Sequence, residues 1–195
     1  MRVISLLLGA VGVLSFVSAP ASAQESGFWL SLGLGYGSAN NACDMCVSGP
    51  RLDGGTASLR LGGTPSSHVR LGGGVDVWTH TSAGQTETLG NVDALLYYYP
   101  FGLRRGVFIS GGLGYSNYGI DSDPSLSGGG WGYTVSVGDD IRVGRRVALT
   151  PNLTYGYGGV GEIDDSYGNV FATGWTQNWM SLGLAVTFFS GHRHY

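Results

Sequence analysis

The sequence predicts an all-β protein, an eight-stranded antiparallel up-and-down transmembrane β-barrel, on three observations. Segments that alternate between apolar and small or polar residues recur along the chain. Glycine supplies 36 of the 195 residues, far above the usual ~7%, and a narrow closed barrel has little room for larger inward side chains. After residue 23 no apolar run reaches the ~18 residues of a membrane-spanning helix. Strands with one apolar face and one small or polar face satisfy all three observations.

The last segment, 176–189, shows the alternation most clearly. Its even positions form an unbroken apolar row, namely Met180, Leu182, Leu184, Val186 and Phe188. Its odd positions are mostly small or hydroxylated, namely Trp179, Ser181, Gly183, Ala185 and Thr187. A strict period of two over about ten residues is typical of one transmembrane barrel strand, with the apolar row towards lipid and the other row towards the lumen.

Turn-forming residues separate eight such segments, which are the eight predicted strands. They span 27–37, 56–62, 68–78, 91–98, 107–115, 131–138, 147–155 and 176–189. Pro151 lies inside the seventh segment and has no N–H to donate to a neighbouring strand. We therefore expect a bulge or another local irregularity at this proline.

Several inward positions carry large side chains. These are Trp29, Arg60, Arg70, Trp78, Tyr97 and Trp179. Eight strands make a barrel only just wide enough for side chains, so we expect a closed lumen with isolated wet pockets beside the inward glycines. A soluble barrel with its apolar residues inside is the alternative. It would crowd Tyr, Leu and Val from every strand into the interior and coat the wet surface with glycine.

The connections alternate in length, as in membrane barrels with short periplasmic turns and longer outer loops. The short ones lie around Pro65, at 100–106 and at 139–146, and the long ones at 40–53, 82–88, 117–128 and 158–175. Both termini are then periplasmic. Aromatic residues are expected to form an interfacial girdle at each side of the membrane. One girdle contains Tyr97, Tyr98, Tyr99 and Phe101, and the other contains Tyr36, Tyr115, Trp131 and Tyr155.

The N-terminus has the pattern of a secretory signal peptide. A basic start is followed by an apolar run too short for a comfortable bilayer span and by small residues ending at Ala23. We expect cleavage after Ala23, with residues 1–23 as the signal peptide. Removing 23 of the 195 residues leaves 172, which form one barrel domain, 24–195, with its strands within about 27–189.

The end of the chain also carries an assembly signal. Ser181, Gly183, Val186 and Phe188 match the C-terminal pattern by which the assembly machinery selects bacterial outer-membrane barrels. Here the chain resembles the small outer-membrane β-barrel family, the group around the membrane domain of OmpA. The tail 190–195 departs from it, because many members stop at the aromatic residue. The resemblance implies an outer-membrane location, with outer-membrane lipid and the barrel assembly machinery as partners.

Two cysteines, Cys43 and Cys46, lie in the first predicted outer loop. In an exported chain they indicate a small disulfide, with unpaired thiols as an alternative. A redox motif would need a βαβ setting, and two cysteines are too few for a structural zinc site.

The charges are sorted by side. The predicted outer loops hold the acids Asp44, Asp53, Glu87, Asp121, Asp123, Glu162, Asp164 and Asp165, with Arg51 as the one base. The predicted periplasmic turns hold Arg104, Arg105, Arg142, Arg145 and Arg146. Clustered acids can bind divalent cations, but without a calcium-loop motif we favour a solvated acidic surface and expect no metal or cofactor. The net charge of −3 makes nucleic acid an improbable partner.

Inside the lumen, Arg60, Arg70, Asp76 and Asp93 lie on neighbouring predicted strands, with His68 nearby. Charges in so narrow a space must be paired or hydrated, so we expect a stabilising polar network. A proton or ion path is the alternative.

At the outer rim, His80, Ser82 and Glu87 supply the residue types of a hydrolytic triad. They share one predicted loop, so nothing in the sequence fixes their geometry. We therefore expect a monomeric, non-catalytic barrel with a structural or surface-interaction role, whose outer loops can meet an extracellular ligand. The alternatives are a narrow porin-like solute or ion channel and, less favoured, a lipid-modifying enzyme.

Overall fold

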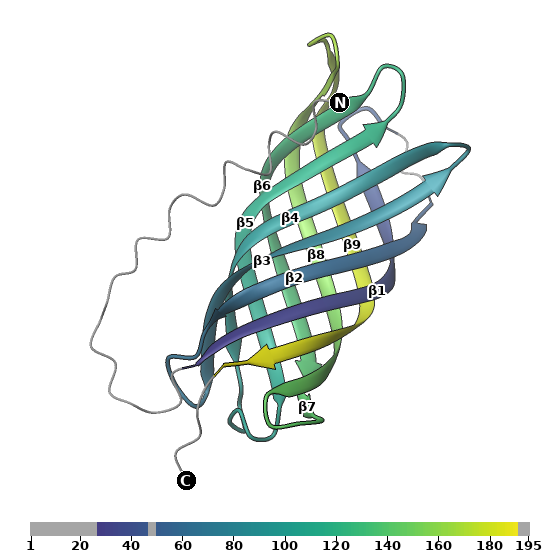
Figure 1. Cartoon of the computed structure of the whole chain (residues 1–195). Helices are drawn as coiled ribbons and strands as arrows, with labels where there is room; N and C mark the ends of the chain where they lie inside the picture. Colours follow the sequence, from purple (N-terminus) through teal and green to yellow (C-terminus); the bar gives the residue numbers. More distant parts are fainter. Residues whose placement is uncertain (1–26, 47–49, 191–195) are drawn as a thin grey trace.

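The computed structural model describes residues 27–46 and 50–190 as one antiparallel sheet (Figure 1). The strands are β1 (Phe28–Ala42), β2 (Leu52–Gly63), β3 (Val69–Ser82), β4 (Gln85–Tyr98), β5 (Val107–Asp121), β6 (Leu126–Asp139), β7 (Ile141–Arg142), β8 (Val147–Asp165) and β9 (Val170–Phe189). Within these residues no helix is long and apolar enough to cross a membrane. The predicted signal peptide and residues 191–195 of the tail lie outside the described residues. The predicted all-β fold with eight long antiparallel strands is confirmed, and β7 is a short addition.

The eight long strands close into a ring. Each pairs with its neighbours along the chain, β9 pairs back onto β1, and β6 pairs with β8. Every long strand therefore has a hydrogen-bonded partner on both sides, which removes the open sheet edges that a bilayer does not tolerate. We call the end with the β1–β2, β3–β4, β5–β6 and β8–β9 connections the outer end. The inner end holds the start of β1 and the end of β9 (Figure 1).

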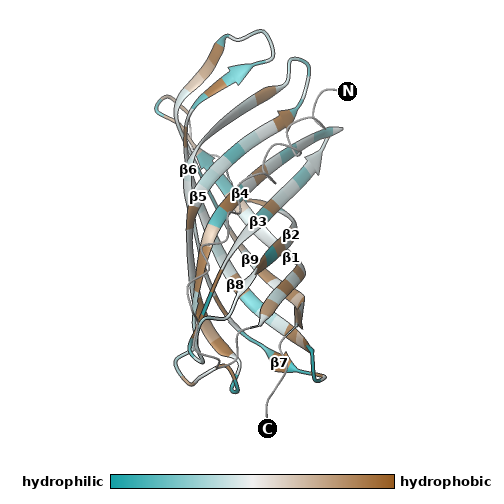
Figure 2. Cartoon of the chain, turned by 60° about the vertical axis from the view of Figure 1, so that its left-hand side comes forward, coloured by the Kyte–Doolittle hydropathy of each residue, from teal (hydrophilic) through white to brown (hydrophobic). Residues whose placement is uncertain are grey.

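Hydrophobic and hydrophilic residues follow one another along the strands (Figure 2), and the two faces of the strands differ in exposure as the alternation predicts. Outward leucines are largely exposed, and Leu34, Leu113 and Leu182 keep 73%, 70% and 70% of their surface. Inward tryptophans such as Trp29 and Trp78 keep 2% and 1%. The alternative of a soluble barrel with its apolar residues inside is therefore wrong.

The outer connections are shorter than the sequence predicts. Most of the segments expected as long outer loops belong to strands. Short turns remain at 83–84, 122–125 and 166–169, and the β1–β2 connection 43–51 is described at 43–46 and 50–51. In the β3–β4 turn, Ala83 and Gly84 both have positive φ, 50° and 81°, the conformation that suits a two-residue hairpin. The outer strand ends were missed because polar and glycine-rich residues replace the apolar alternation there.

The expected irregularity at Pro151 is an interruption of one ladder. Gly138 of β6 pairs with Asn152 of β8, and Ile141 of β7 pairs with Leu149. These pairs share one register, so β7 continues β6 beyond a gap opposite Pro151, which has no N–H to donate. The β8–β9 ladder runs through Pro151 without a shift. Register shifts lie instead nearer the outer end, between residues 127 and 131 of β6 and between 159 and 164 of β8.

The aromatic run at the end of β4 is divided between the two faces. Tyr98 and Phe101 are 50% and 60% exposed on the outside, where a girdle belongs. Tyr97 is buried inside the barrel, as its predicted inward position requires, and Tyr99 is buried there too, so the girdle does not contain these two residues of the run. The strand period of two explains this division, because consecutive residues point to opposite faces. The second predicted girdle, made of Tyr36, Tyr115, Trp131 and Tyr155, is exposed on the outside.

Glycine permits the narrow lumen where two backbones come close. A Cβ on Gly114 of β5 would overlap the carbonyl oxygen of Val92 on β4. Any larger residue at this position would push these two strands apart. The high glycine content predicted a narrow interior, and this contact shows one place where it is needed.

Candidate functional site

Buried side chains fill the barrel interior at both ends. The inner cluster consists of Trp29, Leu95, Tyr97, Tyr99, Leu103 and Phe108. The outer cluster consists of Ala39, Trp78, Leu89, Tyr118, Val160, Ile163 and Trp179. Polar and charged residues lie between and beside these clusters, and they form the candidate site.

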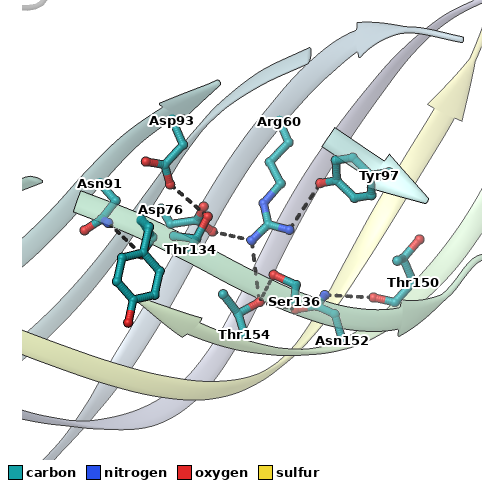
Figure 3. Close-up of polar contacts among 11 residues, drawn as sticks. Arg60, Asp76, Asn91, Asp93, Tyr97, Thr134, Ser136, Thr150, Asn152 and Thr154 are labelled. Carbon is teal, nitrogen blue, oxygen red and sulfur yellow. Dashed lines mark hydrogen bonds and ion pairs between the residues drawn. The ribbon is translucent and has the colours of Figure 1, made fainter. Parts of the chain in front are cut away.

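The central feature of the polar layer is a buried ion pair between β2 and β3 (Figure 3). Arg60 Nη2 lies 2.7 Å from Asp76 Oδ1, and their side chains are 7% and 4% exposed. Arg60 also donates to the Tyr97 hydroxyl at 3.2 Å and to Thr154 Oγ1 at 3.5 Å. The guanidinium thus links β2 to β3, β4 and β8 across the lumen. A charge buried so deeply is tolerated because it is paired and hydrogen-bonded.

A second buried ion pair lies near the inner cluster. Arg70 Nη1 is 2.6 Å from Asp140 Oδ2, and its guanidinium stacks over the rings of Tyr99 and Phe189. Asp140 also accepts hydrogen bonds from the Tyr99 hydroxyl at 2.9 Å and from Thr150 Oγ1 at 2.7 Å. The sequence reasoning placed Asp140 in a periplasmic turn and missed this role. Even-numbered residues of β6 face the lumen, and continuing this alternation through residues 136, 138 and 140 predicts that Asp140 points inward.

The four residues predicted as one lumen network are therefore only partly brought together. Arg60 pairs with Asp76, whereas Arg70 pairs with Asp140. Asp93 belongs to neither pair and accepts a hydrogen bond from Thr134 Oγ1 at 2.8 Å (Figure 3). The placement of His68 beside the network is wrong. It lies exposed in the β2–β3 turn next to Ser67, because β3 begins one residue later.

The space that remains in the lumen is small. One cavity of about 20 Å³ lies beside Arg60 and Arg70, and another of about 10 Å³ lies beside Asp76. Each is about the size needed for a single water molecule. Nε of both arginines and Oδ2 of Asp76 are buried and have no hydrogen-bond partner among the described residues, so single waters could complete their hydrogen bonding.

Cys43 and Cys46 form a disulfide in the turn that follows β1. The backbone N–H of Asp44, inside this small loop, donates to the carbonyl oxygen of Thr173 on β9 at 3.2 Å. The disulfide therefore closes a tight turn that is tied to the β9 strand at the outer end.

The residues considered as a hydrolytic triad lie near one another but have other partners. His80 and Glu87 are opposite each other in the β3–β4 ladder. However, His80 Nδ1 lies 2.6 Å from the carbonyl oxygen of Asp53, and Glu87 accepts a hydrogen bond from Asn41 Nδ2. Ser82 is exposed at the hairpin end and pairs with Gln85. The arrangement does not join nucleophile, base and acid in one chain of hydrogen bonds.

The charges are distributed between the two ends. At the outer end, Arg51 donates to Ser38 Oγ at 3.1 Å and to Asn178 Oδ1 at 2.9 Å. The predicted periplasmic arginines lie in or beside the inner turns, and the Arg142 guanidinium lies 3.8 Å from the Phe189 ring centroid. Across residues 27–46 and 50–190, no three His, Cys, Asp or Glu side chains are grouped to hold a metal ion.

One outer acid has a structural role in the tip of the β8–β9 hairpin. Asp165 Oδ1 accepts hydrogen bonds from the backbone N–H groups of Tyr167 and Asn169, each at 2.8 Å. Its Oδ2 accepts from Asn169 Nδ2 at 2.9 Å. The Asn169 side chain, followed by the backbone donors, lowers the pKa of Asp165 below its ordinary value, because these bonds stabilise the carboxylate.

The residues of the predicted assembly signal lie on β9. Ser181 is buried and faces the lumen, whereas Phe188 is 43% exposed on the outside and pairs in register with Leu30 of β1. Gly183 and Val186 lie between them, opposite Gly35 and Leu32. The predicted signal therefore lies on the strand that completes the ring with β1.

Comparisons with known proteins agree with this architecture. A search of curated proteins finds no match. Ail, the attachment invasion locus protein of Yersinia pestis, solved with the heparin analogue sucrose octasulfate, is similar with a TM-score of 0.55 at 13% identity, over 85% of this chain and 100% of Ail. Neisserial surface protein A gives a TM-score of 0.51 at 16% identity, over 82% of this chain and 96% of that protein. These two likenesses concern the fold.

The family comparison covers almost the whole chain. Residues 9–188 match the model of the outer membrane protein beta-barrel domain. The match includes every strand of the ring except the last residue of β9. With its closed ring of eight long strands and its apolar outer face, this chain belongs to the outer-membrane β-barrel family.

Proposed function

We propose that this outer-membrane barrel is non-catalytic, has a structural or surface-interaction role, and keeps its lumen closed with its own side chains. Lipid then surrounds the outward apolar face, and the outer end meets molecules of the surrounding medium. The single observation that carries the proposal is the filling of the lumen by two buried clusters and two ion pairs.

Packing in the lumen favours this role over a channel. The inner cluster is held by ring contacts, with Tyr97 5.2 Å from both Trp29 and Phe108 between ring centroids. A conducting pore keeps charged groups exposed to its water, whereas Arg60 and Asp76 are almost fully buried against each other. A narrow channel is therefore the second candidate and not the first.

The outer end favours a surface-interaction role over an enzyme. His80 and Glu87 are held by other groups, which argues against a triad. The heparin analogue bound by Ail is a sulfated, anionic molecule. The outer end of this chain is rich in acids, so a partner that is neutral or positively charged suits it better than an anionic one.

A conductance measurement tests the closed lumen. Residues 24–195, refolded into a planar bilayer, should give no steady channels. The variant Trp29→Ala/Tyr97→Ala removes two rings of the inner cluster and should raise the conductance. Tyr98→Ala, which removes a neighbouring ring on the lipid-facing side, is the matched control and should stay silent. Steady, reproducible channels in the unmodified protein would contradict the proposal and favour the channel.

A second measurement concerns the outer surface. Two acidic outer segments, 121–127 and 162–169, include strand residues of β5, β6 and β8. Deleting them would therefore shorten the ladder as well as remove charge. Substitutions such as Glu162→Gln and Asp164→Asn keep the strands and remove only charge. Loss of binding to a candidate partner with unchanged heat resistance would support a surface role. Unchanged binding would contradict a role of these outer acids in binding that partner.

A further inference from the structure

The outer mouth contains a cavity of about 270 Å³ between the ends of five strands. Its walls come from β1, β2, β3, β4 and β9, with Asn41, Leu52, Trp78, Glu87 and Trp175 among them, and from Cys46 and Pro50 of the β1–β2 connection. The volume is close to the ~300 Å³ at which small-molecule pockets begin, and far larger than the two water-sized cavities in the lumen. We propose that this cavity binds a small organic ammonium ion with an aromatic or apolar body. The inference goes beyond the proposed role, because it holds whether or not the lumen conducts.

Aromatic and apolar side chains form most of the wall. Trp78 is 1% exposed and belongs to the outer cluster, and the partly buried Leu52 and Trp175 pack against that cluster. The rings of Trp175 and Tyr118 lie 4.6 Å apart between centroids, which fixes the Trp175 ring. Indole rings favour apolar groups and also attract cations through their negatively polarised faces.

The Glu87 carboxylate lies in this apolar wall, and no cation pairs with it in the part of the chain that the structure describes. It accepts hydrogen bonds from Asn41 Nδ2 and from the Tyr118 hydroxyl and is half-buried. The ion pairs within residues 27–46 and 50–190 are those of Arg60 and Arg70, so Glu87 forms none there. Its cross-strand neighbour His80 has Nδ1 against a backbone carbonyl oxygen. An ammonium group in the cavity would neutralise the Glu87 carboxylate where water is partly excluded, and such charge-assisted bonds are the strong ones.

A primary ammonium suits the Glu87 carboxylate better than a quaternary one. It can donate N–H groups to the carboxylate oxygens, which a quaternary ammonium cannot do. Asn41 and Trp175 also line the cavity, but Asn41 Oδ1 and Trp175 Nε1 are themselves buried, so the hydrogen bonding of the ligand is assigned to Glu87. The ligand class is therefore a primary ammonium on an aromatic or apolar body.

The electrostatics of the outer end point the same way. Acids such as Asp44 and Asp53 lie at the outer end beside the cavity, and Arg51 is held by Ser38 and Asn178. A mouth dominated by one sign of charge concentrates ions of the opposite sign and repels those of its own. Cations are therefore favoured on approach as well as in the cavity.

Binding of 2-amino-3-phenylpropan-1-ol tests the proposal. The probe carries a primary ammonium, a hydroxyl and a phenyl ring, and titration of the refolded barrel in zwitterionic detergent can be followed by tryptophan fluorescence. It should bind saturably, with 3-phenylpropan-1-ol at least tenfold weaker and 3-phenylpropionate weaker still. Glu87→Gln should weaken binding of the amino alcohol about 10- to 100-fold, since it replaces a charge-assisted hydrogen bond by a neutral acceptor. Binding of 3-phenylpropan-1-ol should not change.

Glu162→Gln is the matched control, because it makes the same substitution at an exposed outer position of β8 and should leave binding unchanged. If Glu87→Gln does not refold, Asn41→Leu, which removes the hydrogen bond that orients the Glu87 carboxylate, serves the same comparison, with an expected loss of about tenfold in the preference for the ammonium. The proposal is overturned by equal affinities for the amino alcohol and the alcohol, by equal effects of the two Glu→Gln variants, or by the absence of saturable binding at millimolar probe to a folded barrel.

Discussion

Replacing Asp76 by alanine tests how strongly the buried charges hold the barrel together. The substitution removes the carboxylate that lies 2.7 Å from Arg60 and leaves the guanidinium with hydroxyl partners alone, on Tyr97 and Thr154. Arg60 is 6% exposed, so water cannot replace the lost charge without entering the lumen. Breaking a buried pair on one side costs about 3–5 kcal/mol. We expect a loss of this size in the free energy of unfolding.

Asp93→Asn is the matched control for the loss of an inward carboxylate. Asp93 forms no ion pair and accepts a hydrogen bond from Thr134, which an amide oxygen can also accept. A change of about 1 kcal/mol or less is therefore expected. The double variant Arg60→Met/Asp76→Leu removes both charges together and should recover most of the loss, because apolar replacement of a whole buried pair is often neutral.

Urea unfolding in lipid vesicles, followed by tryptophan fluorescence, gives the three free energies under one set of conditions. The expected order of loss is Asp76→Ala first, with the double variant and Asp93→Asn both far smaller. Equal losses of unfolding free energy for Asp76→Ala and Asp93→Asn would refute the conclusion that the Arg60–Asp76 ion pair stabilises the barrel. A double variant less stable than Asp76→Ala would refute the argument from buried charge.

Three further predictions concern other parts of the barrel. Leu184→Arg places a charge on the lipid-facing side and should lower the free energy of unfolding by about 2–4 kcal/mol near mid-membrane, whereas the inward Ser136→Ala should lower it only slightly. Unfolding in vesicles measures both changes, and the opposite order would show that the inward and outward faces are assigned the wrong way round. Phe188→Ala should lower outer-membrane insertion in cells more than deletion of 191–195, as judged by heat-resistant migration on gels; equal losses would mean that the tail carries the recognition. NMR titration should give Asp165 a pKa below its ordinary value of 3.8. Because the folded pKa is lowered, its hydrogen bonds should stabilise the hairpin tip fully at pH values above the unfolded pKa, and this stabilisation should be lost as the pH falls through the folded pKa. An ordinary pKa would contradict this prediction.

The fold was predictable because alternation is a local signal. In 176–189, apolar and small residues alternate without a break, and the structure places Leu182 and Ser181 on opposite faces. The outer strand ends were not predictable in this way. Residues such as Gly119 and Gly128 belong to β5 and β6 but lie where apolar alternation has ended, so their sequence is typical of a loop.

The lumen was predictable only in its composition. The alternation of inward and outward residues correctly predicts Arg60, Arg70 and Asp76 as lumen residues. It does not predict which of these charges form ion pairs with one another. Arg70 pairs with Asp140, a residue 70 positions along the chain, because the closed ring places the end of β6 across the lumen from β3. The outer cavity was not predictable for a related reason. The sequence predicts Glu87 in a loop, whereas the structure places it in β4.

The hairpins that continue the strands beyond the apolar belt have a consequence for recognition. In a hairpin such as β3–β4, which turns within Ala83 and Gly84, the backbone is already fixed by ladder hydrogen bonds up to the turn. A partner that docks there has little chain motion to suppress, so association costs less ordering entropy than it would with long irregular loops. The specificity of the rim can then change through single side chains at the strand tips while the backbone keeps one shape.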